Sequence, residues 1–202
     1  MITPTCSELL IATSNAGKTL EIQTALGGLP LKLSFLEQVN PATAPVESGE
    51  TYAENAIIKA TEYARQSGLC ALADDSGLEV DYLGGLPGVR SARFGEGSDA
   101  DRVQLLLVRL AGVALQDRRA RFVSVVAIAH PTSGVINIAA GECRGTIKET
   151  PLGENGFGYD PIFVPEGFQL TFGQLPSEIK RKISHRAKAL ASTREFLAEL
   201  LR

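Results

Sequence analysis

The sequence predicts an α/β fold, because short apolar strands alternate with capped helices along the chain. Residues 121–130 are almost continuously apolar, which is typical of a strand covered on both faces. Residues 135–146 follow a Pro-Thr-Ser-Gly turn and are expected to return as the hairpin partner of that strand. Thr51 and Glu54 have the spacing of a capping box, which indicates that a helix starts there.

The other elements are predicted from apolar periodicity and from cap residues. We expect strands at 8–13, 31–35 and 162–164, and helices that end near 26, run from 98 to about 110, and occupy most of 176–202. The length suits one domain or two closely joined lobes, and no repeat or linker-like segment interrupts the chain, so we interpret residues 1–202 as one domain of two lobes.

The composition limits the possible partners and compartments. A net charge of −3 gives no global basic field, so we expect no nucleic-acid polymer as partner. No apolar run approaches the roughly 18 residues that span a bilayer, and the start of the chain has no basic leader. We therefore expect a cytoplasmic protein that does not bind membranes. The cysteines Cys6, Cys70 and Cys143 are odd in number and far apart, so we expect free thiols rather than a disulfide or a zinc site.

A loop of small residues links the first predicted strand to the first predicted helix. Free backbone N–H groups and a lysine at a helix N-terminus favour phosphate, although an ordinary N-cap region would look the same. The spacing nearly matches a phosphate-binding P-loop, but Ala12 stands where the first glycine belongs. The candidate phosphate-binding residues are Thr13, Ser14, Asn15, Ala16, Gly17 and Lys18.

Two adjacent acids, Asp74 and Asp75, follow the apolar residues 71–73 and precede a Ser-Gly pair. We expect them to end a strand, where ligands often bind in α/β proteins, although a strand cap and turn would use the same residues. Adjacent carboxylates repel each other unless a cation or hydrogen bonds compensate them. Asn55 and Lys59 lie one turn apart on the helix that begins after Thr51 and could face the acids if that helix packs beside them.

The third candidate region contains an aromatic ring between glycines. Phe157 lies between two of them and could stack on a planar base, while Asp160 could accept hydrogen bonds from ring N–H groups. A glycine-rich turn before a buried strand, with Phe157 in the core, would give the same pattern. Further along, His185 and Arg186 follow Ser184 at a possible helix start, where they suit an anion or carbonyl acceptor.

Six short motifs stand in a fixed order along the chain: Thr13-Ser14-Asn15-x-Gly17-Lys18, Glu54-Asn55-Ala56-x-x-Lys59-Ala60, Ala73-Asp74-Asp75-Ser76-Gly77-Leu78, Gly85-Leu86-Pro87-Gly88-Val89-x-Ser91-Ala92-Arg93, Phe157-Gly158-Tyr159-Asp160-Pro161 and Ser184-His185-Arg186. In this order the chain resembles the inosine triphosphate pyrophosphatase family, the XTP/dITP diphosphatases, from its first strand to its last helix. Each motif is weak alone, but the ordered set is specific.

The resemblance implies an elongated mixed β-sheet flanked by helices, with two lobes that enclose a nucleotide cleft. It also implies a homodimer that hydrolyses the purine nucleoside triphosphates dITP, ITP and XTP to the monophosphate and pyrophosphate with Mg²⁺. Such a reaction depends on charge neutralisation and positioning more than on covalent chemistry.

Site roles follow from the same resemblance. Asp75 would be the proton acceptor and a metal ligand, with Glu47 as the second ligand. Asp74, Asn55 and Lys59 would support them. The substrate would be held by the Thr13–Lys18 loop and by Ser76, Phe157, Gly158, Tyr159, Asp160, Lys180, His185 and Arg186.

Two positions depart from the family pattern. Val46 stands where the family often has a first acid before Glu47, and Arg90 stands where a tyrosine is expected. Three other functions compete with the main one: a P-loop NTPase or kinase, suggested by Gly17-Lys18-Thr19; a nucleotide-binding module without turnover; and a pyrophosphatase for pyrimidine or modified nucleotides. The paired acids argue against the second, and Ser184-His185-Arg186 argues against the third.

Overall fold

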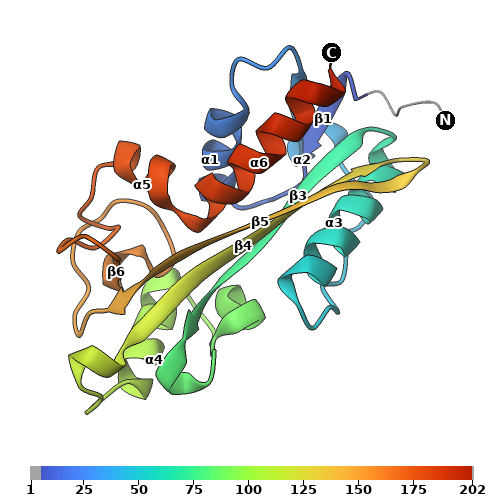
Figure 1. The fold of residues 1–202 in the computed structure, drawn as a ribbon. Coiled ribbons are helices and arrows are strands. Elements are labelled where there is room, and N and C mark those ends of the chain that lie inside the picture. The colour runs from blue at the N-terminus through green and yellow to red at the C-terminus, as the bar shows by residue number, and fades with distance from the viewer. Residues whose placement is uncertain (1–5, 202) are drawn as a thin grey trace. The chain divides into compact units, whose positions relative to one another are not determined.

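The computed structural model describes residues 6–201 and shows a six-stranded mixed sheet with helices around it (Figure 1). The strand order is β2-β1-β3-β4-β5-β6, in which β1 is parallel to both β2 and β3, and β5 is antiparallel to β6. The strands are β1 (Glu8–Ile11), β2 (Lys32–Phe35), β3 (Cys70–Val80), β4 (Arg119–His130), β5 (Gly134–Ile147) and β6 (Phe163–Pro165). The helices are α1 (Ala16–Leu26), α2 (Leu36–Val39), α3 (Tyr52–Ser67), α4 (Asp99–Arg109), α5 (Ser177–Ile183) and α6 (His185–Leu200). The predicted α/β class is confirmed.

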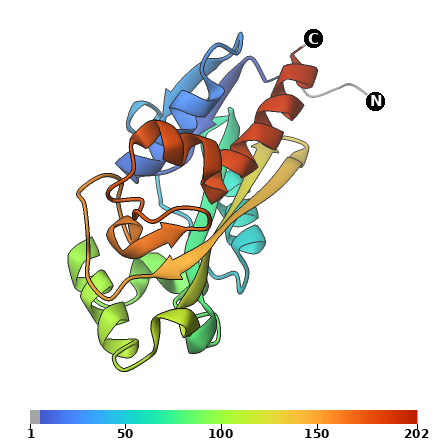
Figure 2. The same cartoon turned by 60° about the vertical axis from the view of Figure 1, so that its left-hand side comes forward.

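The chain forms two compact units, each with its own core. The first unit consists of the chain up to Asp75, Ser124–Gly141, and the chain from Arg186 onward. In it, α1 and α6 cover one face of the sheet and α3 covers the other (Figures 1 and 2). The core on the α1 and α6 side contains Leu9, Ile11, Ile22, Leu26, Leu72, Val126, Ile128, Leu190 and Leu197.

The second unit comprises Ser76–Val123 and Glu142–His185. Its core is built around aromatic rings, with Phe122 and Phe163 only 4.6 Å apart between centroids. Residues from α4 and β3 complete this core, among them Leu78, Val80, Val103, Leu106 and Leu110. The helix predicted from residue 98 to about 110 is therefore present, with Val103 and Leu106 buried and Leu107 only partly buried.

Most predicted helix starts are confirmed by their caps. Thr51 and Glu54 form the expected capping box at the start of α3, and Ser98 caps α4. The predicted end of a strand at the acidic pair is wrong, because β3 continues through Asp74, Asp75 and Ser76 to Val80. Nearby cations compensate both carboxylates, so the acids can lie within a strand instead of ending it.

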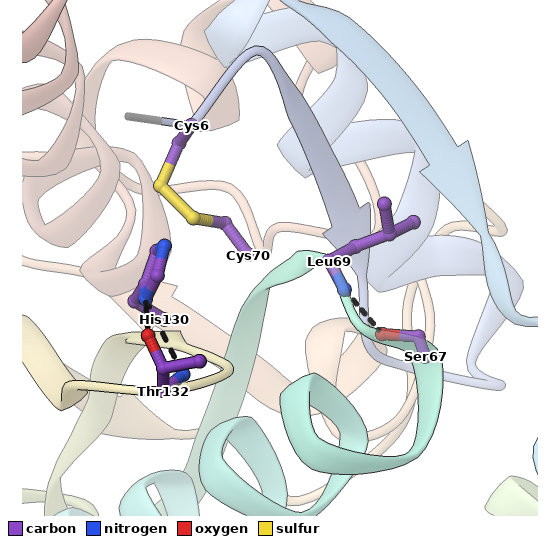
Figure 3. Close-up of a disulfide and its surroundings, with 6 residues drawn as sticks. All are labelled: Cys6, Ser67, Leu69, Cys70, His130 and Thr132. Atoms are coloured by element: carbon purple, nitrogen blue, oxygen red, sulfur yellow. Dashed lines mark hydrogen bonds between the residues drawn. A yellow bond between two sulfur atoms is a disulfide. The ribbon is translucent and has the colours of Figure 1, made fainter. Parts of the chain in front are cut away.

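The expectation of three free thiols is also wrong. Cys6 and Cys70 form a disulfide with a Cα–Cα distance of 5.7 Å (Figure 3). Cys143 is a buried thiol outside this bond. The reason is the parallel pairing of β1 with β3, which places Leu9 opposite Cys70 and brings Cys6 near the start of β3. A sequence separation of 64 residues hides this proximity.

Within residues 6–201, no helix is both long enough and apolar enough to cross a membrane.

The disulfide predicts a specific thiol count. Denatured protein kept without reductant should titrate one thiol with Ellman's reagent, from Cys143, and three after reduction. In the chain-entropy model a cross-link over this separation stabilises the fold by about 4 kcal/mol, so Cys6→Ser should lower the melting temperature while Cys143→Ser serves as the unlinked control. Three titratable thiols before reduction would contradict the bond.

Candidate functional site

The two adjacent acids of β3 point to opposite faces of the sheet, as alternation along a strand requires. Asp74 lies on the same face as Leu72, which packs with α1 and α6. Asp75 lies on the other face, where it contacts Asn55 and Lys59 of α3. One strand thus supplies two carboxylates to two different environments.

Asp74 is a fully buried carboxylate surrounded by positive charge. Lys18 Nζ lies 2.7 Å from Oδ2, and Arg186 Nε lies 3.2 Å from Oδ1. The Ser124 hydroxyl also donates to Oδ1, at 2.5 Å. Burial alone would raise the pKa of Asp74, but the charges of Arg186 and Lys18 hold it well below its usual range. Asp74 therefore stays ionised and serves as an electrostatic anchor.

The negative charge of Asp75 is compensated less completely than that of Asp74. Lys59 Nζ lies 2.8 Å from Oδ1, and the Asn55 amide donates weakly to Oδ2 at 3.4 Å. Burial raises the pKa of Asp75, and the ammonium of Lys59 offsets only part of that effect. Two neighbouring carboxylates whose pKa values are pushed in opposite directions are suited to different roles, and Asp75 is the better proton acceptor of the two.

Glu47 reaches the same lysine from a loop. Its Oε1 lies 2.8 Å from Lys59 Nζ. The loop is held against α3 because the Gly49 N–H donates to Asn55 Oδ1 at 2.8 Å. A Cβ at Gly49 would come within 2.6 Å of the Glu54 Cβ, so only glycine permits this close approach. Gly49 was not predicted from the sequence to have a role, although its position just before the capping box indicates a close approach of the loop to the helix start.

The oxygens around Lys59 suit a hard divalent cation. Carboxylates from Glu47 and Asp75 and the backbone carbonyl of Asp74 all lie within 2.9 Å of its Nζ. Mg²⁺ is usually bound by one or two carboxylates together with substrate phosphates and water. Residues 6–201 contain no cluster of three or more acid, histidine or cysteine side chains that could hold a metal. The two carboxylates and the carbonyl oxygen that are present fit a metal whose remaining ligands would be phosphate and water.

The loop predicted to bind phosphate forms the N-terminus of α1. The side chain of Asn15 caps this helix by accepting from the Lys18 N–H at 2.9 Å, and Thr13 Oγ1 accepts from the Asn15 N–H. The Lys18 side chain turns toward Asp74, which leaves its ammonium close to the helix start. Burial lowers the pKa of Lys18, with opposition from Asp74.

Arg186 lies among acids of the first unit. Its side chain is 2% exposed, and its Nη1 lies 2.5 Å from Glu21 Oε2 in addition to the contact with Asp74. The sequence analysis missed Glu21, although it stands three residues after Lys18 on the same face of α1.

A second cluster lies within the second unit. Lys180 Nζ is 2.5 Å from Asp160 Oδ2, which also accepts from the Phe157 N–H at 2.8 Å. The same ammonium lies 4.5 Å from the centroid of the Phe157 ring. The structure thus brings together three of the residues that were predicted to hold the base.

The other predicted residues of this unit lie around that cluster or its core. His185 stacks on Phe122 with centroids 4.7 Å apart, and the Tyr159 hydroxyl donates to the Ser91 carbonyl. The Gly158 N–H donates to an Asp99 carboxylate oxygen. Two more positions are Ser76, half-buried in β3, and Arg90, exposed after the loop at 84–88.

The fold and these contacts define the class: an α/β protein in which paired carboxylates and lysines meet beside the N-terminus of a helix. Residues 9–196 match the model of the Ham1 family. The chain belongs to the Ham1 family.

Individual relatives agree with that membership. The chain is 50% identical over 186 residues to a dITP/XTP pyrophosphatase of Deinococcus deserti, an alignment that covers 92% of this chain and 86% of the relative. It is 46% identical to a dITP/XTP pyrophosphatase of Nostoc, covering 96% and 95% of the two chains. Among solved structures, a HAM1 protein from Coxiella burnetii superposes with a TM-score of 0.86 at 39% identity, covering 95% of this chain and 98% of that one.

The different environments of the two acids predict unequal effects on stability. Asp74→Asn removes one partner of a buried ion pair and should cost about 3–5 kcal/mol at pH 7. Its lowered pKa means that this stabilisation is present above the ordinary Asp range and disappears as the pH falls through the lowered value. Asp75→Asn should cost less than Asp74→Asn, because burial raises the pKa of Asp75 and makes its ionised form less favourable at neutral pH, which offsets part of the lost ion pair with Lys59.

Calorimetry in EDTA from pH 7 to pH 3 tests both variants. The difference between wild type and Asp74→Asn should shrink toward the acid end. Equal destabilisation by both substitutions at pH 7 would contradict the assigned environments.

Proposed function

We propose that this protein hydrolyses the non-canonical purine nucleoside triphosphates dITP, ITP and XTP to the monophosphate and pyrophosphate, keeping them out of DNA and RNA. The observation that carries the proposal is the joint placement of Glu47 and Asp75 at 2.8 Å from Lys59. Lys18 lies close by at a helix N-terminus that suits phosphate. The printed names of the relatives support the same reaction.

The residues divide the work of this reaction. The Thr13–Lys18 loop binds the triphosphate, with Lys18 as a counter-charge. Asp75 accepts a proton from the attacking water as its oxygen bonds to the α-phosphorus. The bond from that phosphorus to the bridging oxygen then breaks, and pyrophosphate leaves with the electron pair. Glu47 and Asp75 would hold Mg²⁺, which would supply charge neutralisation at the phosphate oxygens.

Base selection is assigned to the cluster around Asp160 and to His185 and Arg186. Phe157 stacks on the purine, and Asp160 accepts from its ring N–H groups, with Gly158, Tyr159 and Lys180 contributing from the same unit. His185 and Arg186 donate to the 6-oxo group of hypoxanthine or xanthine. Adenine presents an amino donor at that position, where these side chains also offer donors, which is a costly mismatch.

The assay that tests the proposal compares dITP, dATP and dGTP with Mg²⁺ and measures pyrophosphate. We expect pyrophosphate release from dITP at a kcat/KM at least about 100-fold above that for dATP, as unpaired polar groups in a dry pocket imply. Orthophosphate as the product would favour a P-loop type NTPase. Tight binding without turnover would favour a binding module, and equal or absent release from all three substrates would refute the proposal.

The Asp75→Asn variant sharpens this assay. Loss of the proton acceptor should reduce kcat by about 10²–10⁴-fold, in the range of general base catalysis. Asp81→Asn is the matched control, because Asp81 follows the same strand at an exposed position. Wild-type turnover by the Asp75→Asn variant would refute the role of Asp75 as proton acceptor.

We further propose that the protein is a homodimer and lies in the cytoplasm. The support is the resemblance of its six motifs to those of the family. Light scattering after size exclusion should give twice the 21.5 kDa chain mass. A mass equal to one chain at micromolar concentration would contradict the dimer.

A further inference from the structure

Lys59 occupies the position in which a metal ion would meet its protein ligands. Its ammonium has three N–H donors, and three oxygens surround it: Asp74 O at 2.9 Å, Asp75 Oδ1 at 2.8 Å and Glu47 Oε1 at 2.8 Å. All three donors are therefore used, and all three acceptors are oxygens of the kind that Mg²⁺ prefers. The same atoms serve either an ammonium or a divalent cation.

We propose that Lys59 is an internal cation that holds the Glu47 and Asp75 carboxylates together before the metal binds and must release them when it does. This rests on the proposed metal-dependent function. Lys59 is then a positioning residue whose contacts set how tightly free metal is bound without nucleotide.

Charge and size make the two occupants exclusive. Mg²⁺ binds oxygens at about 2.0–2.1 Å, so an ammonium held at its present distances from the same oxygens would lie against a doubly charged ion. With Lys59 in place, Glu47 and Asp75 carry a net charge of −1, and after its release they present −2 to the metal. The long, flexible stem of a lysine allows its ammonium to swing toward an arriving phosphate. Metal and triphosphate would then enter together.

The surroundings separate this cluster from a purely structural ion pair. Arg186 and Asp74 have side chains only 2% and 0% exposed, and Ser124 completes that arrangement. In the Lys59 cluster, by contrast, the Glu47 side chain is 26% exposed. The Lys59 cluster is therefore open to solvent, and to a hydrated metal, at Glu47, whereas the Arg186–Asp74 pair itself is shielded.

The carboxylates have supports that do not depend on Lys59. The hydrogen bond from the Gly49 N–H to the Asn55 side chain holds the loop that carries Glu47. Asp75 is held by its place within strand β3. Removing the ammonium should therefore leave the two acids near each other, with nothing to offset their repulsion except an added cation.

Isothermal titration with Mg²⁺ alone, without nucleotide, tests the inference. Lys59→Met should bind Mg²⁺ at least about tenfold more tightly than wild type, since a like charge at contact distance is removed. Its metal-free melting temperature should fall, and Mg²⁺ should restore it. Lys59→Arg keeps the positive charge, so its affinity for Mg²⁺ should stay as weak as that of wild type. Lys32→Met, which removes a lysine from an exposed pair with Glu8 in the same unit, is the control and should match wild type.

Lys59→Gln is a second neutral variant. Its amide can still donate hydrogen bonds to the carboxylates, so it is used if Lys59→Met does not fold. Unchanged or weaker Mg²⁺ binding by either folded neutral variant would overturn the inference, since a lysine that must release these oxygens opposes metal binding while it is present. The titration contains no nucleotide, so its result is independent of whether the protein releases pyrophosphate from dITP.

Discussion

Two carboxylates on neighbouring residues of a buried strand require positive charge on both faces of the sheet. Asp74 receives it from Lys18 and Arg186, and Asp75 receives it from Lys59. These cations come from α1, α6 and α3, so the pair fixes which helix faces must pack on the strand. Because the compensation is stronger for Asp74, one acid remains an anchor and the other keeps a capacity for protons. Structure and chemistry thus depend on one electrostatic requirement.

The loop before α3, which carries Glu47 and Gly49, adds a further carboxylate next to Asp75 and so forms the candidate binding site. Asn55 contacts both Gly49 and Asp75, so a single buried amide links the loop to the acid across the helix start. Glu47 is thereby placed beside Lys59 although it stands 28 residues before Asp75 in the sequence. In the second unit, Asp160 plays a comparable part by joining the Phe157 backbone to Lys180. Each cluster is ordered by one polar side chain with several partners.

Local patterns predicted much of this protein, and long-range contacts were the part that they could not supply. The capping box at Thr51 located α3, because that signal lies within four residues. The acids were misplaced at a strand end, since the lysines that compensate them are distant in sequence. The bond between Cys6 and Cys70 was missed for the same reason. Motif order named the candidate site residues as a set, and their roles stay predictions, while the partners of Arg186 emerged only from the fold.

The most direct test of the account is the position of water attack. Hydrolysis of dITP in ¹⁸O-water, followed by mass spectrometry of both products, reports which phosphorus receives the new oxygen. Attack at the α-phosphorus with Asp75 as proton acceptor places the label in the nucleoside monophosphate and leaves pyrophosphate unlabelled. Label in pyrophosphate or in orthophosphate would place the attack at another phosphorus and contradict the site described for this protein.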